Sequence, residues 1–260
     1  MRCRPWLAFA LSAALLAFDR VSAEPVAVRH REGLVHGFLT LRTVAGTLLA
    51  SGDLTQHARG DQVTTRLTFR FKDGSTHDET TVYSQSGTFR LVTDHLVQKG
   101  PAFTQPLEMS IDAASGRVTV RYKDEHGKEK VESEHLELPD DVANGMVLTL
   151  LKNMSPGGPL PGLSYVAATP KPRLVKLAIS VAGADSFSTA GMARKASHYV
   201  LKVELGGIAG LLAPILGKQP PDNHVWVLGG DTPAFVRSEG PLFNGGDPWR
   251  IELTSPVWSK

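Results

Sequence analysis

Cysteine is nearly absent from this chain: Cys3 is the single example in 260 residues, and it lies close to the N-terminus. The remainder therefore has no thiol for a disulfide, a cysteine nucleophile or a thiolate metal site. A lipoprotein leader would need a cysteine directly after its apolar run, and none stands there. A chain without disulfides depends on its buried core for stability, and this one is long enough to form a core.

The motifs of common enzyme classes are absent as well. The sequence has no Gly-x-Ser-x-Gly elbow, no His-Glu-x-x-His, no Walker loop and no Gly-x-Gly-x-x-Gly after a strand. The glycine-rich stretch 206–210 lacks the lysine and the helix start that a phosphate cradle needs. We therefore predict no cofactor and assign no catalytic residue from motifs.

Neither sign of charge is in excess. The chain has 28 lysines and arginines against 26 acidic residues, and removal of the first 23 residues leaves equal numbers of the two. The charges are mixed along the chain rather than gathered in blocks. This pattern argues against a nucleic-acid partner, which needs a basic face, and against a polybasic membrane patch.

The first 23 residues have the pattern of a signal peptide. Arg2 and Arg4 precede an apolar run from Trp6 to Phe18, and Val21-Ser22-Ala23 then supplies small residues for a signal peptidase. The alternative is a retained membrane anchor, but the run of 13 residues is shorter than the ~20 that span a bilayer. We expect cleavage after Ala23, a single mature domain over 24–260, and a periplasmic or secreted location.

Two-residue alternation dominates the mature chain. Between Val63 and Lys72, apolar residues or Thr alternate with Thr, Arg and Lys, which is typical of a strand with one buried face. Asp73-Gly74 follows as a turn that tolerates positive φ. By the same criteria, strands are predicted at 33–41, 47–57, 63–72, 76–83, 88–98, 107–111, 118–122, 131–138, 163–168, 173–181, 194–205, 224–228, 233–239 and 249–254.

One helix is predicted in mid-chain. Pro139-Asp140-Asp141 offers a favourable acidic start, and Val142, Met146, Leu150 and Met154 then recur at helical spacing. We therefore expect a mainly β fold: a curved antiparallel sheet, as a half-barrel or open barrel, with one mid-chain helix.

The segment 205–216 differs from the rest because it has twelve residues without a charge. It is too short to span a membrane, and Pro214 argues against a regular helix through its middle. We expect a buried connection or a short apolar helix that plugs one open end of the sheet. The alternative is a flap over a ligand cavity or a segment that touches a membrane surface.

Histidine and carboxylate residues gather at one predicted hairpin end, His77-Asp78-Glu79. The simplest interpretation is a solvated polar turn, and the alternative is a metal site or a general base with an orienting carboxylate. His95 falls on the apolar side of its predicted strand, where a lone histidine is usually a hydrogen-bonded core residue.

Several stretches resemble a group of uncharacterised exported bacterial proteins, a likeness that implies no activity. The order of elements also resembles the lipoprotein-carrier type of half-barrel, which curls a sheet around an apolar cavity. The first likeness is carried by Phe71-Lys-Asp-Gly-Ser-Thr-His-Asp-Glu79, Gln85, Phe89-Arg-Leu91, Gln98-Lys-Gly-Pro-Ala-Phe103, Leu136-Glu-Leu-Pro139, Asn144-Gly-Met-Val147 and Lys218-Gln-Pro-Pro-Asp222.

The leading functional hypothesis is an exported protein that holds or carries an apolar molecule such as an envelope lipid. The first alternative is a hydrolase or metal-dependent enzyme that uses residues 77–79, and the second is a non-catalytic interaction module of the cell envelope. The candidate ligand-binding residues are apolar: Phe69, Phe71, Phe89, Tyr122, Trp226, Leu211 and Leu212.

Overall fold

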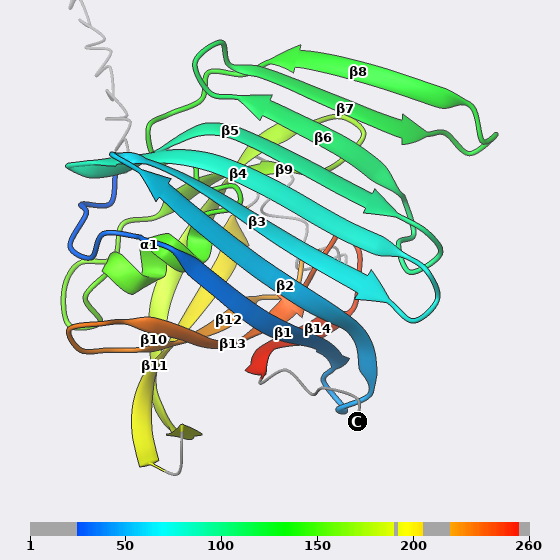
Figure 1. Cartoon of the computed structure of the whole chain (residues 1–260). Helices are drawn as coiled ribbons and strands as arrows, with labels where there is room; N and C mark the ends of the chain where they lie inside the picture. Colours follow the sequence, from blue (N-terminus) through cyan, green and yellow to red (C-terminus); the bar gives the residue numbers. More distant parts are fainter. Residues whose placement is uncertain (1–24, 190–191, 205–218, 255–260) are drawn as a thin grey trace, which may run out of the picture.

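The computed structural model describes residues 25–189, 192–204 and 219–254, which form one antiparallel sheet and a short helix (Figure 1). This confirms the predicted fold class. The strands are β1 (Val35–Thr43), β2 (Leu48–Arg59), β3 (Gln62–Phe71), β4 (Thr76–Ser86), β5 (Thr88–Lys99), β6 (Leu107–Asp112), β7 (Arg117–Lys123), β8 (Glu129–His135), β9 (Leu163–Ala167), β10 (Arg173–Thr189), β11 (Met192–Glu204), β12 (Asn223–Leu228), β13 (Ala234–Pro241) and β14 (Pro248–Thr254).

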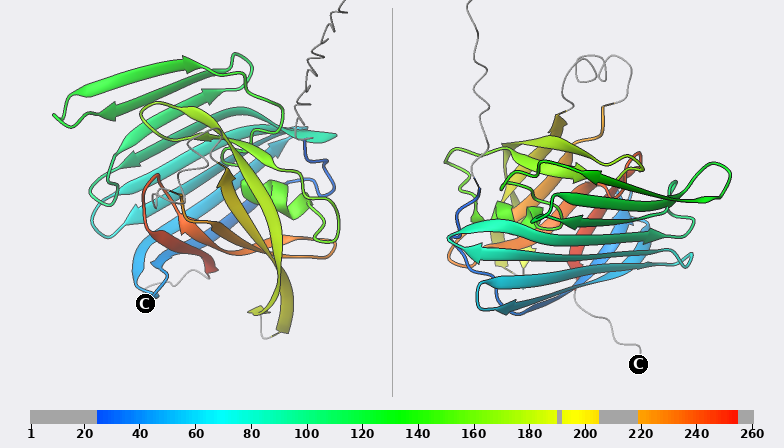
Figure 2. Two further views of the ribbon diagram at one scale, coloured as in Figure 1. Left: turned by 180° about the vertical axis from the view of Figure 1, so that it is seen from behind. Right: turned by 90° about the horizontal axis from the view of Figure 1, so that it is seen from above.

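The sheet consists of two meanders that share one seam. Its strand order is β8-β7-β6-β5-β4-β3-β2-β1-β14-β13-β12-β11-β10-β9, so the first strand of the described chain pairs with the last. The two edge strands, β8 and β9, are consecutive in sequence but lie at opposite ends of this order. The sheet curls so that the second meander turns back across the inner face of the first (Figure 2). It remains open, because β8 and β9 do not pair.

Short turns join most neighbouring strands of the first meander. In the β3–β4 turn, the Phe71 amide donates to the Ser75 carbonyl at 2.9 Å, and Gly74 takes a φ of +86°. Such a conformation is strained for residues with a Cβ atom. The Asp73-Gly74 signal in the sequence therefore marks a real hairpin.

The inner face of the curled sheet carries the core. Paired residues form rows across β2, β3 and β4, and most positions in these rows are buried, among them Phe69, Val63 and Tyr83 at 0% exposure. Strands β6 and β7 continue this face with Met109 and Val120, which are also fully buried. The alternation read between Val63 and Lys72 therefore gives the correct buried face of β3.

The helix α1 (Val147–Asn153) is shorter than the sequence pattern predicts. It lies inside the curl, between the two meanders (Figure 2), and buries Leu150 and Leu151. The expected helix start near Val142 is wrong because Gly145 adopts a φ of +64°, outside the helical region. A Cβ atom at Gly145 would collide with the Thr81 hydroxyl group, so the backbone at Gly145 passes close to β4.

A bulge in β5 changes which residues face inward. Tyr83 pairs with Leu91 but Val82 pairs with Thr93, so Val92 is an extra residue in β5. Beyond this point the inward positions are Asp94, Leu96 and Gln98, all nearly fully buried. The prediction that His95 lies on the apolar side is wrong, since its side chain is about half exposed and lies 3.3 Å from Glu108.

Two predictions fall outside the described residues. One is the signal peptide with its cleavage site after Ala23, and the other is the apolar plug or flap at 205–216. The helices of the described ranges are all too short or too polar to cross a bilayer.

Candidate functional site

The inner face of strand β4 is polar along its length. Its inward side chains are His77, Glu79, Thr81, Tyr83 and Gln85, although β4 lies well inside the sheet order. Inward positions of a strand normally carry apolar residues, and buried polar groups persist where they are hydrogen-bonded or functional. The groups along β4 fall into two sets that differ in whether their polar atoms have partners.

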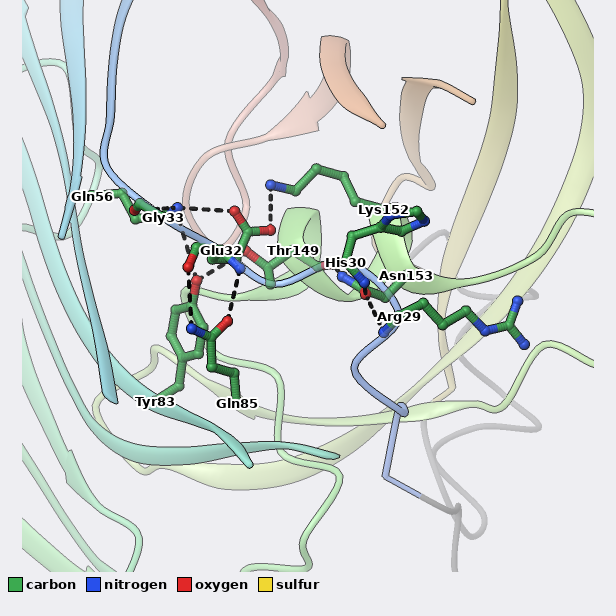
Figure 3. Close-up of polar contacts among 10 residues, drawn as sticks. All are labelled: Arg29, His30, Glu32, Gly33, Gln56, Tyr83, Gln85, Thr149, Lys152 and Asn153. Carbon is green, nitrogen blue, oxygen red and sulfur yellow. Dashed lines mark hydrogen bonds and ion pairs between the residues drawn. The ribbon is translucent and has the colours of Figure 1, made fainter. Parts of the chain in front are cut away.

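The first set centres on Glu32, whose side chain is 7% exposed (Figure 3). One carboxylate oxygen accepts a hydrogen bond from Gln56 Nε2 at 2.9 Å, and the other lies 2.5 Å from Lys152 Nζ. Gln85 contacts the backbone of the same residue twice, since it accepts from the Glu32 amide at 2.7 Å and donates to the Glu32 carbonyl at 3.1 Å. Glu32 therefore has partners at its backbone and at both carboxylate oxygens.

Helix α1 and the N-terminal segment complete this set. The Tyr83 hydroxyl donates to Gln56 Oε1 at 3.3 Å and lies 3.3 Å from Thr149 Oγ1. Asn153 Oδ1 accepts from the backbone amides of Arg29 and His30, at 2.9 and 2.7 Å (Figure 3). A network with its polar groups paired in this way rigidifies a fold, so we interpret the Glu32 set as structural.

The second set centres on Glu79 and Asp94, which lie on neighbouring strands. Asp94 pairs directly with Thr81, so Glu79, two residues away on the same face of β4, is the diagonal neighbour of Asp94. The Thr81 hydroxyl donates to Asp94 Oδ1 at 2.7 Å. The other carboxylate oxygen, Oδ2, is buried and has no hydrogen-bond partner among the described residues.

Burial perturbs the acidity of this pair. Desolvation raises the pKa of Asp94 to about 6, against the opposing effect of the Thr81 hydrogen bond. Desolvation, followed by the charge of Asp94, raises the pKa of Glu79 well above its ordinary value. Tyr165 of β9 lies close enough for both carboxylates, after burial itself, to raise the pKa of its hydroxyl group. One strand of the second meander, β9, therefore lies close to the pair.

His77 occupies the next inward position of β4 and is 3% exposed. Gln98 Nε2 donates to the Leu242 carbonyl at 3.0 Å and lies 3.2 Å from His77 Nδ1, which fixes Nδ1 as the acceptor. The ring proton then sits on Nε2, which is buried without a partner in the described part of the chain. Burial lowers the pKa of His77 to about 4, so the ring is neutral near pH 7.

The row of paired inward residues that contains Glu79 is less well covered than its neighbours. Leu54, Leu67 and Glu79 pair across β2, β3 and β4, and all three keep partial exposure. The rows on either side are nearly fully buried: Gly52, Phe69 and His77 on one side, and Gln56, Thr65 and Thr81 on the other. Accessible surface therefore persists along one line of the inner face, at the position of Glu79.

The sequence-predicted trio 77–79 is divided between the two faces of the sheet. His77 and Glu79 point inward, and Asp78 points outward, where it accepts bidentate hydrogen bonds from Arg66. The three side chains do not converge, and the solvated hairpin end expected here is wrong for His77. Across the described ranges, no group of three or more His, Cys, Asp or Glu side chains is arranged to hold a metal ion.

The predicted apolar ligand-binding residues are divided as well. Phe69 and Phe89 are fully buried core, and Tyr122 is partly buried against that core. Phe71 belongs to an aromatic cluster with Phe103 and Trp249, and it borders a shallow hollow of about 320 Å³. Leu211 and Leu212 lie outside the described residues.

Trp226 does not join the inner face. Its neighbours Val225 and Val227 belong to the core, whereas Trp226 packs in a separate small cluster with Ala196 and Leu228. There the ring stacks on His198 at 4.2 Å between centroids, and the Arg237 guanidinium lies 4.1 Å above it. Its indole nitrogen donates to Asp185 at 2.6 Å. Trp226, a predicted ligand-binding residue, therefore lies off the inner face.

Comparison with known proteins gives one structural likeness. The chain is similar to a solved beta-barrel-like protein of domain of unknown function DUF1849 from Brucella abortus, with a TM-score of 0.49 and 10% sequence identity. The alignment covers 88% of this chain and 99% of that one. No protein-family model matches the chain, and no curated protein matches it. The expected likeness to lipoprotein carriers stays a prediction.

Sequence reasoning missed Asp94 and Tyr165 as members of the candidate site. The alternation in 88–98 is interrupted by the extra residue Val92, and no single-sequence signal places that bulge. Tyr165 reaches the pair only because the sheet curls, which brings β9 over β4 and β5. A signal for β4 did exist: the run 76–86 contains almost no apolar residue on either face, which is unusual for a strand so far from the sheet edge.

Proposed function

We propose that this chain is an exported binding protein that holds a small apolar or amphipathic molecule against the inner face of its curled sheet. The observation that carries the proposal is the partly exposed row of Leu54, Leu67 and Glu79 between two buried rows. Export rests on the leader pattern in the sequence, with basic residues, an apolar run and a small-residue cleavage site.

The chemistry around this row suits such a ligand. Two leucines supply apolar surface, and one carboxylate with its diagonal neighbour Asp94 supplies polar groups at the end of the row. Sites for small molecules are mostly apolar, with a few placed polar groups that orient the ligand. The structural Glu32 set holds helix α1 and the N-terminal segment in place (Figure 3), and its member Gln56 lies on β2, two residues from Leu54.

The direct test is to purify residues 24–260 from the envelope of the native host and to analyse an organic extract by mass spectrometry. A stoichiometric apolar molecule, absent from a control protein purified in the same way, supports the proposal. A second arm measures binding of the uncharged dye N-phenyl-1-naphthylamine to recombinant protein by its fluorescence increase.

Matched variants locate the binding. Leu67→Gln places an amide on the partly exposed row, and we expect at least tenfold weaker dye binding. Val131→Gln makes the same kind of change at a side chain on β8 that is 57% exposed, and we expect no change. A clean extract together with no dye binding would overturn the proposal, as would equal binding by both variants.

A further inference from the structure

The buried carboxylate sites of the described residues differ in one respect: Glu32 and Asp141 each have a lysine partner, and the Glu79–Asp94 pair has none. Lys152 lies 2.5 Å from Glu32. No lysine or arginine within the described ranges forms an ion pair with Glu79 or Asp94. Within the described residues, the fold thus supplies a counter-ion to Glu32 and to Asp141 and leaves two neighbouring carboxylates without one.

An unpaired polar atom accompanies the missing charge. Asp94 is 1% exposed, its Oδ1 accepts from Thr81, and its Oδ2 has no partner in the part of the chain that the structure describes. A buried polar atom without a hydrogen bond is costly, so native structures usually supply a partner from the chain, from water or from a ligand. When both carboxylates are ionised they only accept hydrogen bonds, so an occupant that satisfies Oδ2 and Glu79 together in that state must donate more than one.

We propose that Glu79 and Asp94 bind the ammonium group of an amphiphilic ligand whose hydrocarbon part lies along Leu54 and Leu67. This inference rests on the proposed function and names its ligand class. A primary ammonium group carries one positive charge and three donors, which matches two adjacent carboxylates. A hydroxyl headgroup brings one donor and no charge, and a carboxylate headgroup adds repulsion.

A metal ion fits the same place less well. Calcium takes six to eight oxygen ligands, and magnesium requires near-octahedral geometry. The described residues place no third His, Asp or Glu in a metal-binding arrangement with this pair. The apolar row beside the carboxylates also favours an organic cation with a hydrocarbon chain, because the leucines offer no ligand to a metal.

The test compares three single-chain amphiphiles of equal length: dodecylammonium, dodecanol and dodecanoate. Binding of each to residues 24–260 is measured by calorimetry at pH 7, below the concentration at which micelles form. We expect dodecylammonium to bind at least tenfold more tightly than dodecanol, and dodecanoate to bind most weakly. In the double variant Glu79→Gln/Asp94→Asn, the affinity for dodecylammonium should fall to the affinity for dodecanol. The affinity for dodecanol should be retained, which shows that the variant is folded.

The matched control is Glu129→Gln/Glu132→Gln, which makes the same change of net charge at exposed positions of β8. We expect this variant to keep the preference for the ammonium headgroup. Equal binding of the three amphiphiles by the wild-type protein would overturn the ammonium inference and leave the proposed function standing. The inference would also be overturned if Glu79→Gln/Asp94→Asn kept the preference for dodecylammonium over dodecanol, or if the control variant lost it. Either result would place the ammonium group at the protein surface rather than at Glu79 and Asp94. If none of the three binds, the proposed function fails and the inference with it.

Discussion

Lys152 Nζ on helix α1 lies 2.5 Å from Glu32 Oε1, and the two side chains are 18% and 7% exposed. The pair joins two segments that are far apart in sequence, and Gln56, Gln85 and Tyr83 surround it with hydrogen bonds (Figure 3). Desolvation can offset much of the attraction in a buried ion pair, whereas loss of one partner leaves a buried charge. The pair therefore positions the helix and the N-terminal segment rather than simply adding stability.

Substitution of Lys152 should be costly. Lys152→Met leaves the Glu32 carboxylate buried without its cation, and we expect a loss of about 3–5 kcal/mol in the free energy of unfolding. Glu32→Gln should cost less, because Lys152 is the more exposed partner. Arg31→Gln, at an exposed ion pair with Asp61, is the control and should cost less than about 1 kcal/mol. Urea denaturation measures all three, and equal losses for Lys152→Met and Arg31→Gln would contradict the prediction.

Asp94→Asn should stabilise the protein at neutral and alkaline pH. The folded-state pKa of Asp94, about 6, lies above its ordinary value of 3.8. Its contribution to stability is therefore full below about pH 4 and is lost as the pH rises toward 6. We expect the free energy of unfolding of the variant to be about 1–3 kcal/mol higher than that of the wild type at pH 8, and nearly the same at pH 4. Denaturation at the two pH values tests this, with Glu132→Gln as an exposed control that shows no such change.

His77 should produce the opposite pH dependence. Its folded-state pKa, about 4, lies below its ordinary value of 6.5, because burial disfavours the charged ring. The stability it contributes is present above pH 6.5 and is lost as the pH falls toward 4. In the Asp94→Asn background, the free energy of unfolding should fall by about 1–3 kcal/mol between pH 6.5 and pH 4 because of His77. His77→Phe should abolish this fall. His126→Phe, at a side chain that is 82% exposed, should leave the slope unchanged, and an unchanged slope in His77→Phe would contradict the assignment.

Gly145 should tolerate alanine poorly. It has a φ of +64°, and a Cβ atom there would collide with the Thr81 hydroxyl and approach Asp94. Gly145→Ala combines backbone strain with overpacking, and we expect a loss of about 3 kcal/mol. Gly46 has a φ of +100° with open space around its Cβ position, so Gly46→Ala carries the backbone strain alone, about 1–2 kcal/mol. Thermal unfolding of both variants separates the two effects, and equal losses would exclude the collision.

Alternation and turn residues in the sequence were sufficient to predict the strands and the fold class. They were insufficient where hydrophobicity does not alternate. The run from Val225 to Leu228 is apolar at every position, so the pattern cannot tell which face Trp226 takes. Around Glu79 both faces of β4 are polar, so the two-residue alternation again does not indicate which face is buried.

The candidate site was harder to predict than the fold, because its residues meet through tertiary structure. Glu79 was noted in the sequence, but with Asp78, from which the pleat of the strand separates it. Its actual neighbour Asp94 faces inward only because of the bulge at Val92, and Tyr165 arrives from the other end of the sheet.

The pairing of β1 with β14 affects the order in which the sheet can form during synthesis. Most neighbouring strands within each meander are joined by short connections, and contacts between residues close in sequence form quickly. The seam instead joins residues such as Leu39 and Leu253, which are among the most distant in the described chain. A chain that has not yet been completed would therefore carry β1 as an unprotected edge, open to pairing with another molecule. Within the described chain, the strand that protects β1 is therefore the one synthesised latest, β14.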